Sequence, residues 1–280
     1  MPTTTKAAIR TDGAVLYTHR RAPAAPGAPS LVFSNSLGTD LRIWDPLVAV
    51  LPADWGLLFC DKRGHGLTLS DASDWSIEDL ARDVAALMDA TGTGPSVIVG
   101  LSVGGLIAQA LYAMAPERVS GIVLCDTAAK IGTDEMWDTR IAAVERGGMA
   151  AIVETTMERW FTARFRGDVR ASAPYRAMVA RCDPAGYVAT ARAIRAADYR
   201  DRAGAIAVPC HAIVGEDDGS TPPALVQQTA QMIPGCGFDV IADAGHIPCV
   251  EQPAVLAALI EAHVARVSGT RVSGTRVSGN

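Results

Sequence analysis

The stretch V-I-V-G-L-S-V-G-G at residues 97–105 is the feature that most constrains the fold of this chain. Its G-x-S-x-G pattern is typical of a tight turn between a strand and a helix, in which the serine has a strained backbone conformation. Residues 96–101 form an apolar run typical of a buried strand, and residues 103–115 have a helical pattern that Pro116 ends. We therefore predict that Ser102 is a nucleophile, and that the flanking glycines avoid collisions with neighbouring backbone.

Apolar runs recur along the chain, and segments with helical patterns separate most of them. The runs lie at residues 30–34, 56–60, 96–101, 120–125, 208–214 and 237–241. This alternation predicts an α/β fold with a mostly parallel, doubly wound sheet that is covered by helices on both faces. Ahead of it, Asp12-Gly13 joins the runs at 7–10 and 14–19, which predicts an antiparallel hairpin.

A long insertion interrupts this alternation after the run at 120–125. It has roughly eighty residues, many more than a single crossover helix needs, and its pattern is helical. We predict a helical cap at residues 133–202, inserted into a core formed by residues 1–132 and 203–266. The last segment, 267–280, repeats R-V-S-G-T and is predicted to be a disordered tail.

The composition argues against several classes of function. The net charge of -5 disfavours a protein that binds duplex nucleic acid, because phosphate contacts require a basic surface. The chain has neither an apolar run of about 18 residues nor a signal-peptide core, so we expect no membrane span and no export, with the cytoplasm as the location. The six cysteines and five histidines lack the spacing of metal ligands, so we expect reduced cysteines, no metal and no cofactor.

A serine nucleophile needs a general base, and the base needs an acid that fixes its tautomer. His246 comes just after the last predicted strand, where a loop could bring its ring over the edge of the sheet. Asp218 lies beyond the preceding strand and is our choice of acid, with Glu216 and Asp217 in the same loop as alternatives. The chain order Ser102, Asp218, His246 is the one associated with α/β-hydrolases.

The oxyanion of a tetrahedral intermediate needs two hydrogen-bond donors. The amide of Val103 follows from the turn itself, since it lies at the N-terminus of the predicted helix. The second donor should come from the loop after the strand at 30–34. There the amide of Leu37 is the candidate, because Gly38 allows the backbone to turn inward. Taken alone, this loop is better explained as a plain turn.

Six segments carry a resemblance that is more specific than the G-x-S-x-G pattern. They read L-V-F-S-N-S-L-G-T-D-L-R-I-W-D at 31–45, D-K-R-G-H-G at 61–66, G-L-S-V-G-G at 100–105, E-R-W-F-T at 158–162, D-G-S-T-P-P at 218–223 and A-G-H-I-P-C-V-E-Q-P at 244–253. Together they resemble the 3-oxoadipate enol-lactone hydrolases, which are cap-bearing α/β-hydrolases of aromatic catabolism. The resemblance extends over most of residues 10–265. It implies an α/β-hydrolase fold and a Ser-His-Asp triad that opens the lactone ring through an acyl-serine, in the β-ketoadipate pathway.

Two positions depart from the pattern of that family. Leu67 and Thr68 take the place where a serine usually follows R-G-H-G, and Lys62 stands where a small polar residue is commoner. Both changes concern the loop at the mouth of the expected pocket. R-G-H-G also contains a second histidine, His65, which we interpret as structural because His246 has the better place in the chain order.

The expected cap is positively charged relative to the rest of the chain. Residues 134–202 contain 12 arginines and 10 acidic residues, whereas the remainder contains 13 basic and 20 acidic residues. We expect most of these arginines in salt bridges on helix surfaces. The lactone that the resemblance implies carries a carboxylate, which an arginine could bind through two hydrogen bonds. Arg159, Trp137 and Trp160 are the pocket candidates, although packing within the cap also explains them.

The sequence leaves three hypotheses about function open. The first is a lactonase that acts on a small anionic lactone, with neither nucleic acid nor membrane as a partner. A broader carboxylesterase, a C–C bond hydrolase or a cofactor-free perhydrolase could use the same triad, because a fold does not fix its substrate. A non-catalytic receptor or scaffold of this fold typically lacks a triad member, and here all three are present.

Overall fold

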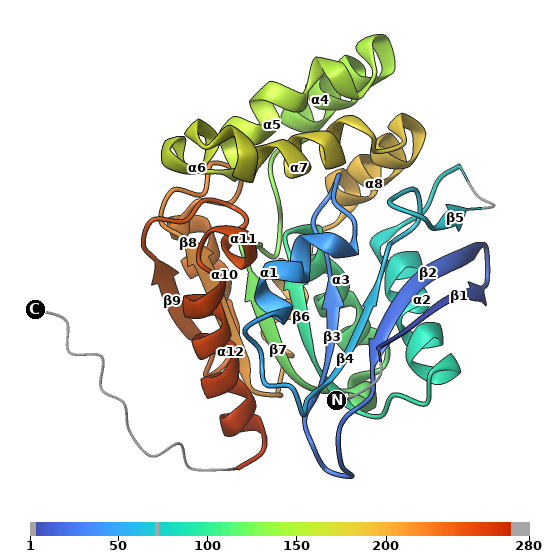
Figure 1. The fold of residues 1–280 in the computed structure, drawn as a ribbon, viewed down its shortest axis with the longest axis vertical. Coiled ribbons are helices and arrows are strands. Elements are labelled where there is room, and N and C mark those ends of the chain that lie inside the picture. The colour runs from blue at the N-terminus through green and yellow to red at the C-terminus, as the bar shows by residue number, and fades with distance from the viewer. Residues whose placement is uncertain (1–3, 71–72, 270–280) are drawn as a thin grey trace, which may run out of the picture.

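The structure, a computed structural model, describes residues 4–70 and 73–269, and within them a nine-stranded sheet forms the centre of the molecule (Figure 1). The strands lie in the order β1-β2-β4-β3-β6-β7-β8-β9, and β5 pairs with β2. Their bounds are Thr4–Thr11 (β1), Ala14–Arg21 (β2), Ser30–Ser34 (β3), Gly56–Cys60 (β4), Leu69–Ser70 (β5), Ser96–Leu101 (β6), Val119–Cys125 (β7), Cys210–Gly215 (β8) and Gly237–Ile241 (β9).

The pairing of the strands follows the hydrophobic patterns. From β4 through β9 every neighbouring pair is parallel, and β4, β6 and β8 are buried along their whole length, which accounts for their continuous apolar runs. The hairpin of β1 and β2 is antiparallel, as predicted, and β2 also pairs antiparallel with β4. The predicted mostly parallel, doubly wound sheet is confirmed.

Helices cover both faces of this sheet. On one face α1 (Asp45–Val48) contacts α12 (Pro253–Val267), and on the other α2 (Ile77–Ala90) contacts α3 (Val103–Met114) (Figure 1). The short elements η1 (Leu41–Trp44), η2 (Pro116–Arg118), α9 (Arg200–Ala203) and α11 (Pro248–Glu251) connect strands and helices, and α10 (Pro223–Met232) packs on β8 and β9.

Helix α12 runs through Val267, so the first residue of the segment predicted to be a disordered tail is helical. The buried face of α12 explains why the helix reaches Val267. Ile260 and Val264 pack into the core, and Val267 packs against it. Residues 270–280, which hold most of the R-V-S-G-T repeat, lie outside the described residues. No helix in the described part of the chain has both the length and the apolar character that a membrane span requires.

A layer of helices lies above the carboxyl ends of the parallel strands (Figure 1). It consists of α4 (Asp134–Gly147), η3 (Met149–Ala151), α5 (Val153–Trp160), α6 (Ala163–Gly167), α7 (Val169–Ala180) and α8 (Pro184–Ala196). Thr133, Thr162, Asp168 and Asp183 each cap a helix of this layer with a side-chain oxygen. These caps mark the starts of four helices of this layer.

The helical layer meets the rest of the molecule by a close backbone approach. A Cβ atom on Gly186, in α8, would overlap the backbone of Gly64, which follows β4 and has φ +67°. Nearby, the indole nitrogen of Trp75 donates a hydrogen bond to the hydroxyl of Thr190, at 3.2 Å. The position of α8 therefore depends on the absence of a side chain at Gly186.

We expect Gly186→Ala to lower the stability of the molecule by about 1–3 kcal/mol, because α8 must move away from Gly64 to make room. Gly167→Ala is the matched control, since it changes a glycine of the same helical layer that has open space around it. Thermal unfolding of both variants measures the difference. A melting temperature of Gly186→Ala equal to that of the control would contradict the close approach.

Candidate active site

Ser102 lies on a sharp turn between β6 and α3. Its backbone angles, φ 58° and ψ -117°, are unfavourable for a residue that has a side chain. A Cβ atom on Gly100 would overlap the carbonyl group of Gly104, and one on Gly104 would overlap that of Ser34 in β3. The predicted reason for the two glycines is therefore confirmed.

Three hydrogen bonds hold the turn in this conformation. The amide of Ser102 donates to the carbonyl of Cys125 at the end of β7, at 2.9 Å. The hydroxyl of Thr127 and the amide of Gly105 both donate to the carbonyl of Ser102, at 2.6 and 2.8 Å. Such backbone strain costs about 1–3 kcal/mol, and each hydrogen bond contributes about 0.5–1.5 kcal/mol, so the three together offset it.

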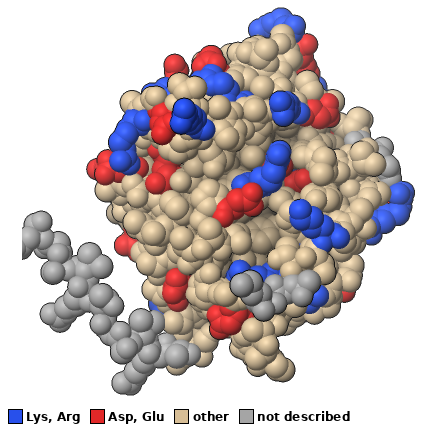
Figure 2. All heavy atoms as spheres, in the orientation of Figure 1, with Lys and Arg blue, Asp and Glu red and all other residues tan. Residues whose placement is uncertain are grey.

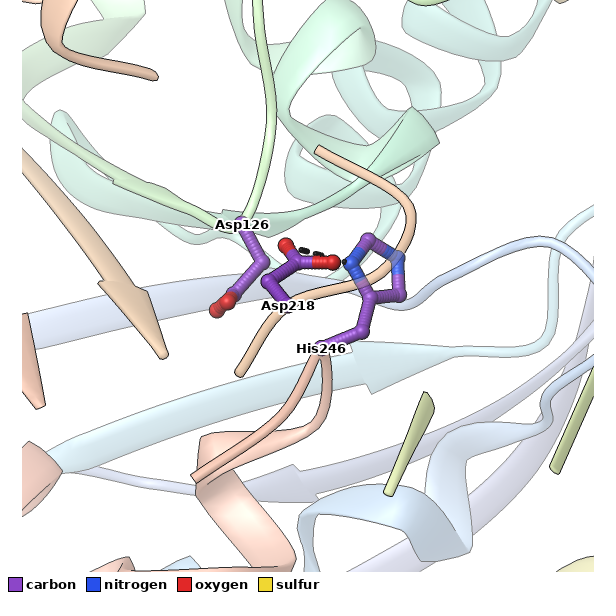
Figure 3. Close-up of side chains that lie close together, drawn as sticks. All are labelled: Asp126, Asp218 and His246. Carbon is purple, nitrogen blue, oxygen red and sulfur yellow. Dashed lines mark hydrogen bonds and ion pairs between the residues drawn. The ribbon is translucent and has the colours of Figure 1, made fainter. Parts of the chain in front are cut away.

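Asp218 and His246 form a buried pair (Figure 3). Oδ2 of Asp218 lies 2.9 Å from Nδ1 of His246, and the two side chains are 0% and 2% exposed. Asp218 comes from the loop after β8 and His246 from the loop between β9 and α11. Of the three candidate acids in the first loop, Asp218 is buried, whereas Glu216 and Asp217 are exposed.

The carboxylate of Asp218 is held in its charged form. Burial by itself raises its pKa, but the nearby charge of His246, the hydrogen bond to that ring and the amides of Thr221 and Ser220 outweigh burial and lower the pKa. The hydroxyl of Thr221 also donates to Asp218, at 2.7 Å. A fixed anion next to Nδ1 favours the tautomer that leaves Nε2 of His246 free to accept a proton.

Asp126 is a third member of this cluster that the sequence analysis missed (Figure 3). It follows β7, has φ 46° and is fully buried. Its Oδ1 accepts the amide of Gly215 at 2.8 Å, while Oδ2 has no hydrogen-bond partner. Burial, and then the negative charge of Asp218, raise the pKa of Asp126 well above its usual range. No local sequence pattern around Asp126 indicates its positive φ or its contacts, which depend on the packing of β7 against β8.

Asp126, Asp218 and His246 also have the chemistry of a metal-binding set. One donor atom from each lies within 4.8 Å of the others. The hydrogen bond between Asp218 and Nδ1 of His246 already uses one donor atom of each residue, and the high pKa of Asp126 favours its neutral form, which is a poor ligand. The cluster therefore fits an acid–histidine pair with a protonated neighbour better than a metal site.

The two predicted oxyanion donors, the amides of Leu37 and Val103, belong to residues next to the Asp218–His246 pair or to Ser102. Leu37 lines the same pocket as Ser102 and His246, and Val103 is the first residue of α3. Within the described residues, neither amide donates to a protein acceptor. By contrast, the amide of the adjacent Gly38 donates to Nε2 of His65 at 2.9 Å. His65 is thus bonded to the loop on the pocket's edge, consistent with its interpretation as structural.

The pocket over Ser102 is roofed by the helical layer. Its cavity volume is about 40 Å³. Its lining consists of Ser36, Leu37, Ser102, Ile131, Met136, Arg140, Tyr187, Ser220, His246 and the three predicted pocket residues, Trp137, Arg159 and Trp160. Trp137 is fixed by a hydrogen bond from its indole nitrogen to the carbonyl of Ile131, at 2.7 Å. The walls are therefore largely apolar, with two arginines as the cationic groups.

The arginines of the pocket differ from those that form ion pairs on the surface. Figure 2 shows basic and acidic side chains interspersed over this part of the surface. In the described part of the chain, Arg176, Arg192, Arg195, Arg200 and Arg202 each pair with a carboxylate. These are fewer than half of the 12 arginines at residues 134–202, so the expectation that most of them form salt bridges is wrong. Within the described residues, Arg140 and Arg159 form no such ion pair.

Arg140 and Arg159 together make the roof of the pocket electropositive. Nε of Arg140 donates to the hydroxyl of Tyr187 at 2.5 Å, and Nη2 donates to that of Thr156 at 2.7 Å, so its guanidinium is fixed. Burial, and then the positive charge of Arg140, lower the pKa of Arg159. An anion bound between the two would offset this repulsion. Arg159 was selected from the sequence but Arg140 was not, because the contacts of α4 with Tyr187 in α8 and Thr156 in α5 join segments that are distant in the chain.

The helical layer also holds the loops that carry the acid and the base. The amide of Gly219, next to Asp218, donates to the carbonyl of Arg159 at 3.2 Å. Glu251 accepts the amide of Gly245, next to His246, at 2.8 Å, and the hydroxyl of Thr162 at 2.6 Å. Movement of α5 or α6 therefore acts on both loops.

Comparison with known proteins gives a consistent result. Residues 26–259 match the model of the alpha/beta hydrolase family. The chain is 33% identical to 3-oxoadipate enol-lactonase 2 of Acinetobacter baylyi, over 85% of this chain and 89% of that protein. It is 34% identical to 3-oxoadipate enol-lactonase 1 of the same organism, over 86% and 90%. The crystal structure of the enol-lactonase from Burkholderia xenovorans superposes with a TM-score of 0.87 at 34% identity, covering 93% of this chain and 100% of that one.

We expect Asp126→Asn to keep near-wild-type stability at neutral pH, because asparagine retains the acceptor for Gly215 and has no charge, and burial favours the neutral form of Asp126. Asp126→Ala should lose about 1–3 kcal/mol, since it leaves that buried amide unsatisfied. Urea unfolding of both variants at pH about 7 measures the two losses. Equal losses in the two variants would show that Asp126 is needed as a charged group.

Proposed function

The chain belongs to the alpha/beta hydrolase family, and we propose that it opens the ring ester of 3-oxoadipate enol-lactone to give 3-oxoadipate. Ester hydrolysis is the reaction supported by the family and by the relatives of known activity. The observation that carries the proposal is the pocket over Ser102, which combines the Asp218–His246 pair with two unpaired arginines. An ester that carries a carboxylate matches both features.

In the first half of the reaction, Ser102 attacks the carbonyl carbon of the lactone. His246 accepts the proton of the serine at Nε2, while Asp218 keeps Nδ1 protonated. The amides of Leu37 and Val103 bind the oxyanion that forms. The ring C–O bond then breaks, and the departing enolate takes the proton from Nε2 of His246, which gives an enol and returns His246 to its neutral form. Because an enolate is a better leaving group than an alkoxide, this step needs little help from an acid.

In the second half, water hydrolyses the acyl-serine. His246 takes a proton from the water, which attacks the acyl carbon, and the same two amides bind the second oxyanion. The bond to Ser102 breaks, and the serine recovers its proton from His246. The enol formed in the first half becomes the 3-oxo group of the product. Every step uses groups of this chain and water alone.

The carboxylate of the substrate binds at the roof of the pocket. Arg159 is the group best suited to bind it, because its side chain lines the pocket and its pKa is lowered by burial and by the charge of Arg140. A carboxylate there would form charge-assisted hydrogen bonds and cancel part of that repulsion. Trp137 and Trp160 supply the apolar walls on either side.

Replacing Ser102 with alanine should lower kcat by at least about 10⁴-fold, because the nucleophile is lost while the pocket is kept. The assay follows the enol-lactone and a neutral aryl ester in parallel. Unchanged rates in Ser102→Ala would refute the nucleophile. A wild-type enzyme that cleaves the aryl ester but ignores the lactone would instead be a broader carboxylesterase.

Arg159→Met should raise KM for the lactone about 10–100-fold, which corresponds to the loss of a charged hydrogen bond of about 1.5–3 kcal/mol. Hydrolysis of a neutral aryl ester should change little, since it has no carboxylate to bind. Arg176→Met, which removes an arginine of α7 already paired with Glu154 on the surface, is the control. An equal rise in KM for both substrates would point to a damaged pocket rather than to a lost carboxylate contact.

A further inference from the structure

Lys62 is a buried cation that the proposed mechanism does not use. It follows β4, and only 5% of it is exposed. Its ammonium group lies against backbone: Nζ donates to the carbonyl of Ser36 at 2.5 Å and to that of Thr39 at 3.3 Å. In the described part of the chain it forms no ion pair, and the nearby carboxylates of Asp40 and Asp61 are hydrogen-bonded to other groups.

The carbonyl of Ser36 receives an unusual number of donors. Besides Lys62, the hydroxyl of Thr39 donates to it at 2.9 Å and the amide of Thr39 at 3.3 Å. This carbonyl belongs to the same peptide unit as the amide of Leu37. Hydrogen bonds accepted at the oxygen of a peptide polarise it and strengthen its N–H as a donor, and a charged donor does so most.

The rest of the loop is fixed so that the amide of Leu37 is the one available to the pocket. The next amide, that of Gly38, is bonded to Nε2 of His65, whose Nδ1 lies 2.9 Å from the carbonyl of Arg63. Burial, and then the charge of Lys62, lower the pKa of His65 well below its usual range, so the ring is neutral and Nε2 accepts. Of these two amides, only that of Leu37 is unbonded within the described residues, and Leu37 lines the pocket together with Ser102.

We propose that Lys62 is a positioning residue for the oxyanion hole, acting through the peptide that joins Ser36 to Leu37. It touches no reacting atom. Its charge orients and polarises that peptide before the substrate arrives, and the benefit appears when negative charge develops on the carbonyl oxygen. The inference rests on the roles proposed for Ser102 and Leu37, but it applies to any ester that Ser102 attacks.

The charge of Lys62 is also sensitive to pH. Burial lowers its pKa to about 8, although the nearby carboxylates of Asp61 and Asp40 favour the charged form. The thiols of Cys60 and Cys182 have pKa values raised to about 12 by burial, and His65 is already neutral. Near pH 8 the amine is therefore the group in this set that changes charge. A neutral amine still donates hydrogen bonds, but more weakly, so kcat should fall as pH rises through about 8.

The test compares wild type with Lys62→Met, which keeps the length of the side chain and removes its charge and donors. The substrates are p-nitrophenyl acetate and the enol-lactone, and kcat and KM are measured from about pH 6 to about pH 10. Rates are expressed per active serine, counted by titration with a fluorophosphonate, so that misfolded protein does not enter the comparison. Lys62→Arg provides a second variant, with a charge that does not titrate in this range.

We expect kcat of Lys62→Met to be about ten-fold lower with KM nearly unchanged, because losing a whole oxyanion donor costs about 10²–10³-fold and here the donor is only weakened. The decline of kcat near pH 8 should vanish in Lys62→Met and Lys62→Arg, and Lys62→Arg should recover part of the rate. Lys130→Met is the matched control, since Lys130 also donates to a carbonyl, that of Arg195, at 2.6 Å and does not line the pocket. Lys130→Met should keep the wild-type kcat and the decline of kcat near pH 8.

Two results would overturn the inference: a wild-type kcat in Lys62→Met, or a decline near pH 8 that persists in it. A variant in which only KM changes would also exclude an effect on the oxyanion. Failure of the proposed function looks different. If the wild-type enzyme cleaves the aryl ester but not the lactone, only the assignment of the lactone as substrate fails. If Ser102→Ala keeps the wild-type rates, the assignment of Ser102 as nucleophile fails, and the role of Lys62 fails with it.

Discussion

The strained turn at Ser102 is the constraint on which the rest of the site depends. The absence of side chains at Gly100 and Gly104 allows β6 to approach α3, and α3 to approach β3, closely enough to form the turn. The amide and carbonyl of Ser102 are bonded to β7 and to the loop that follows it, through Cys125 and Thr127. The two strands next to β6 therefore fix Ser102, and the order of the sheet decides which loops lie near it.

The same geometry explains how much of the molecule could be read from the sequence. Each feature that was predicted correctly has a local pattern: the strand at 96–101, the glycines of the turn and the hairpin before the sheet. The two-residue strand β5 was missed because pairing with β2, rather than its own sequence, defines it. The start of the predicted tail was placed at 267, although Val267 is the last residue of α12, because the buried face of that helix outweighs a polar repeat.

The residues that the sequence could not reveal act through contacts between distant segments. Asp126 is an ordinary residue after a strand until β8 brings the amide of Gly215 to one oxygen and Asp218 close to the other. Arg140 belongs to the pocket because Tyr187 and Thr156, from two other helices, fix its guanidinium. Lys62 looked like a small departure at the pocket mouth, and its bond to Ser36 became visible only with the loop in place.

The charges of these residues form one consistent arrangement. Esterolysis places negative charge on an oxyanion and positive charge on the imidazole, so the groups around them should balance each in turn. Burial favours a neutral Asp126, which leaves Asp218 as the anion that is hydrogen-bonded to His246. Lys62 donates to the loop that carries the amide of Leu37, while Arg140 and Arg159 line the pocket from the helical layer. Two separate cationic regions in an acidic protein suit a substrate that is an anion at one end and becomes an oxyanion at the other.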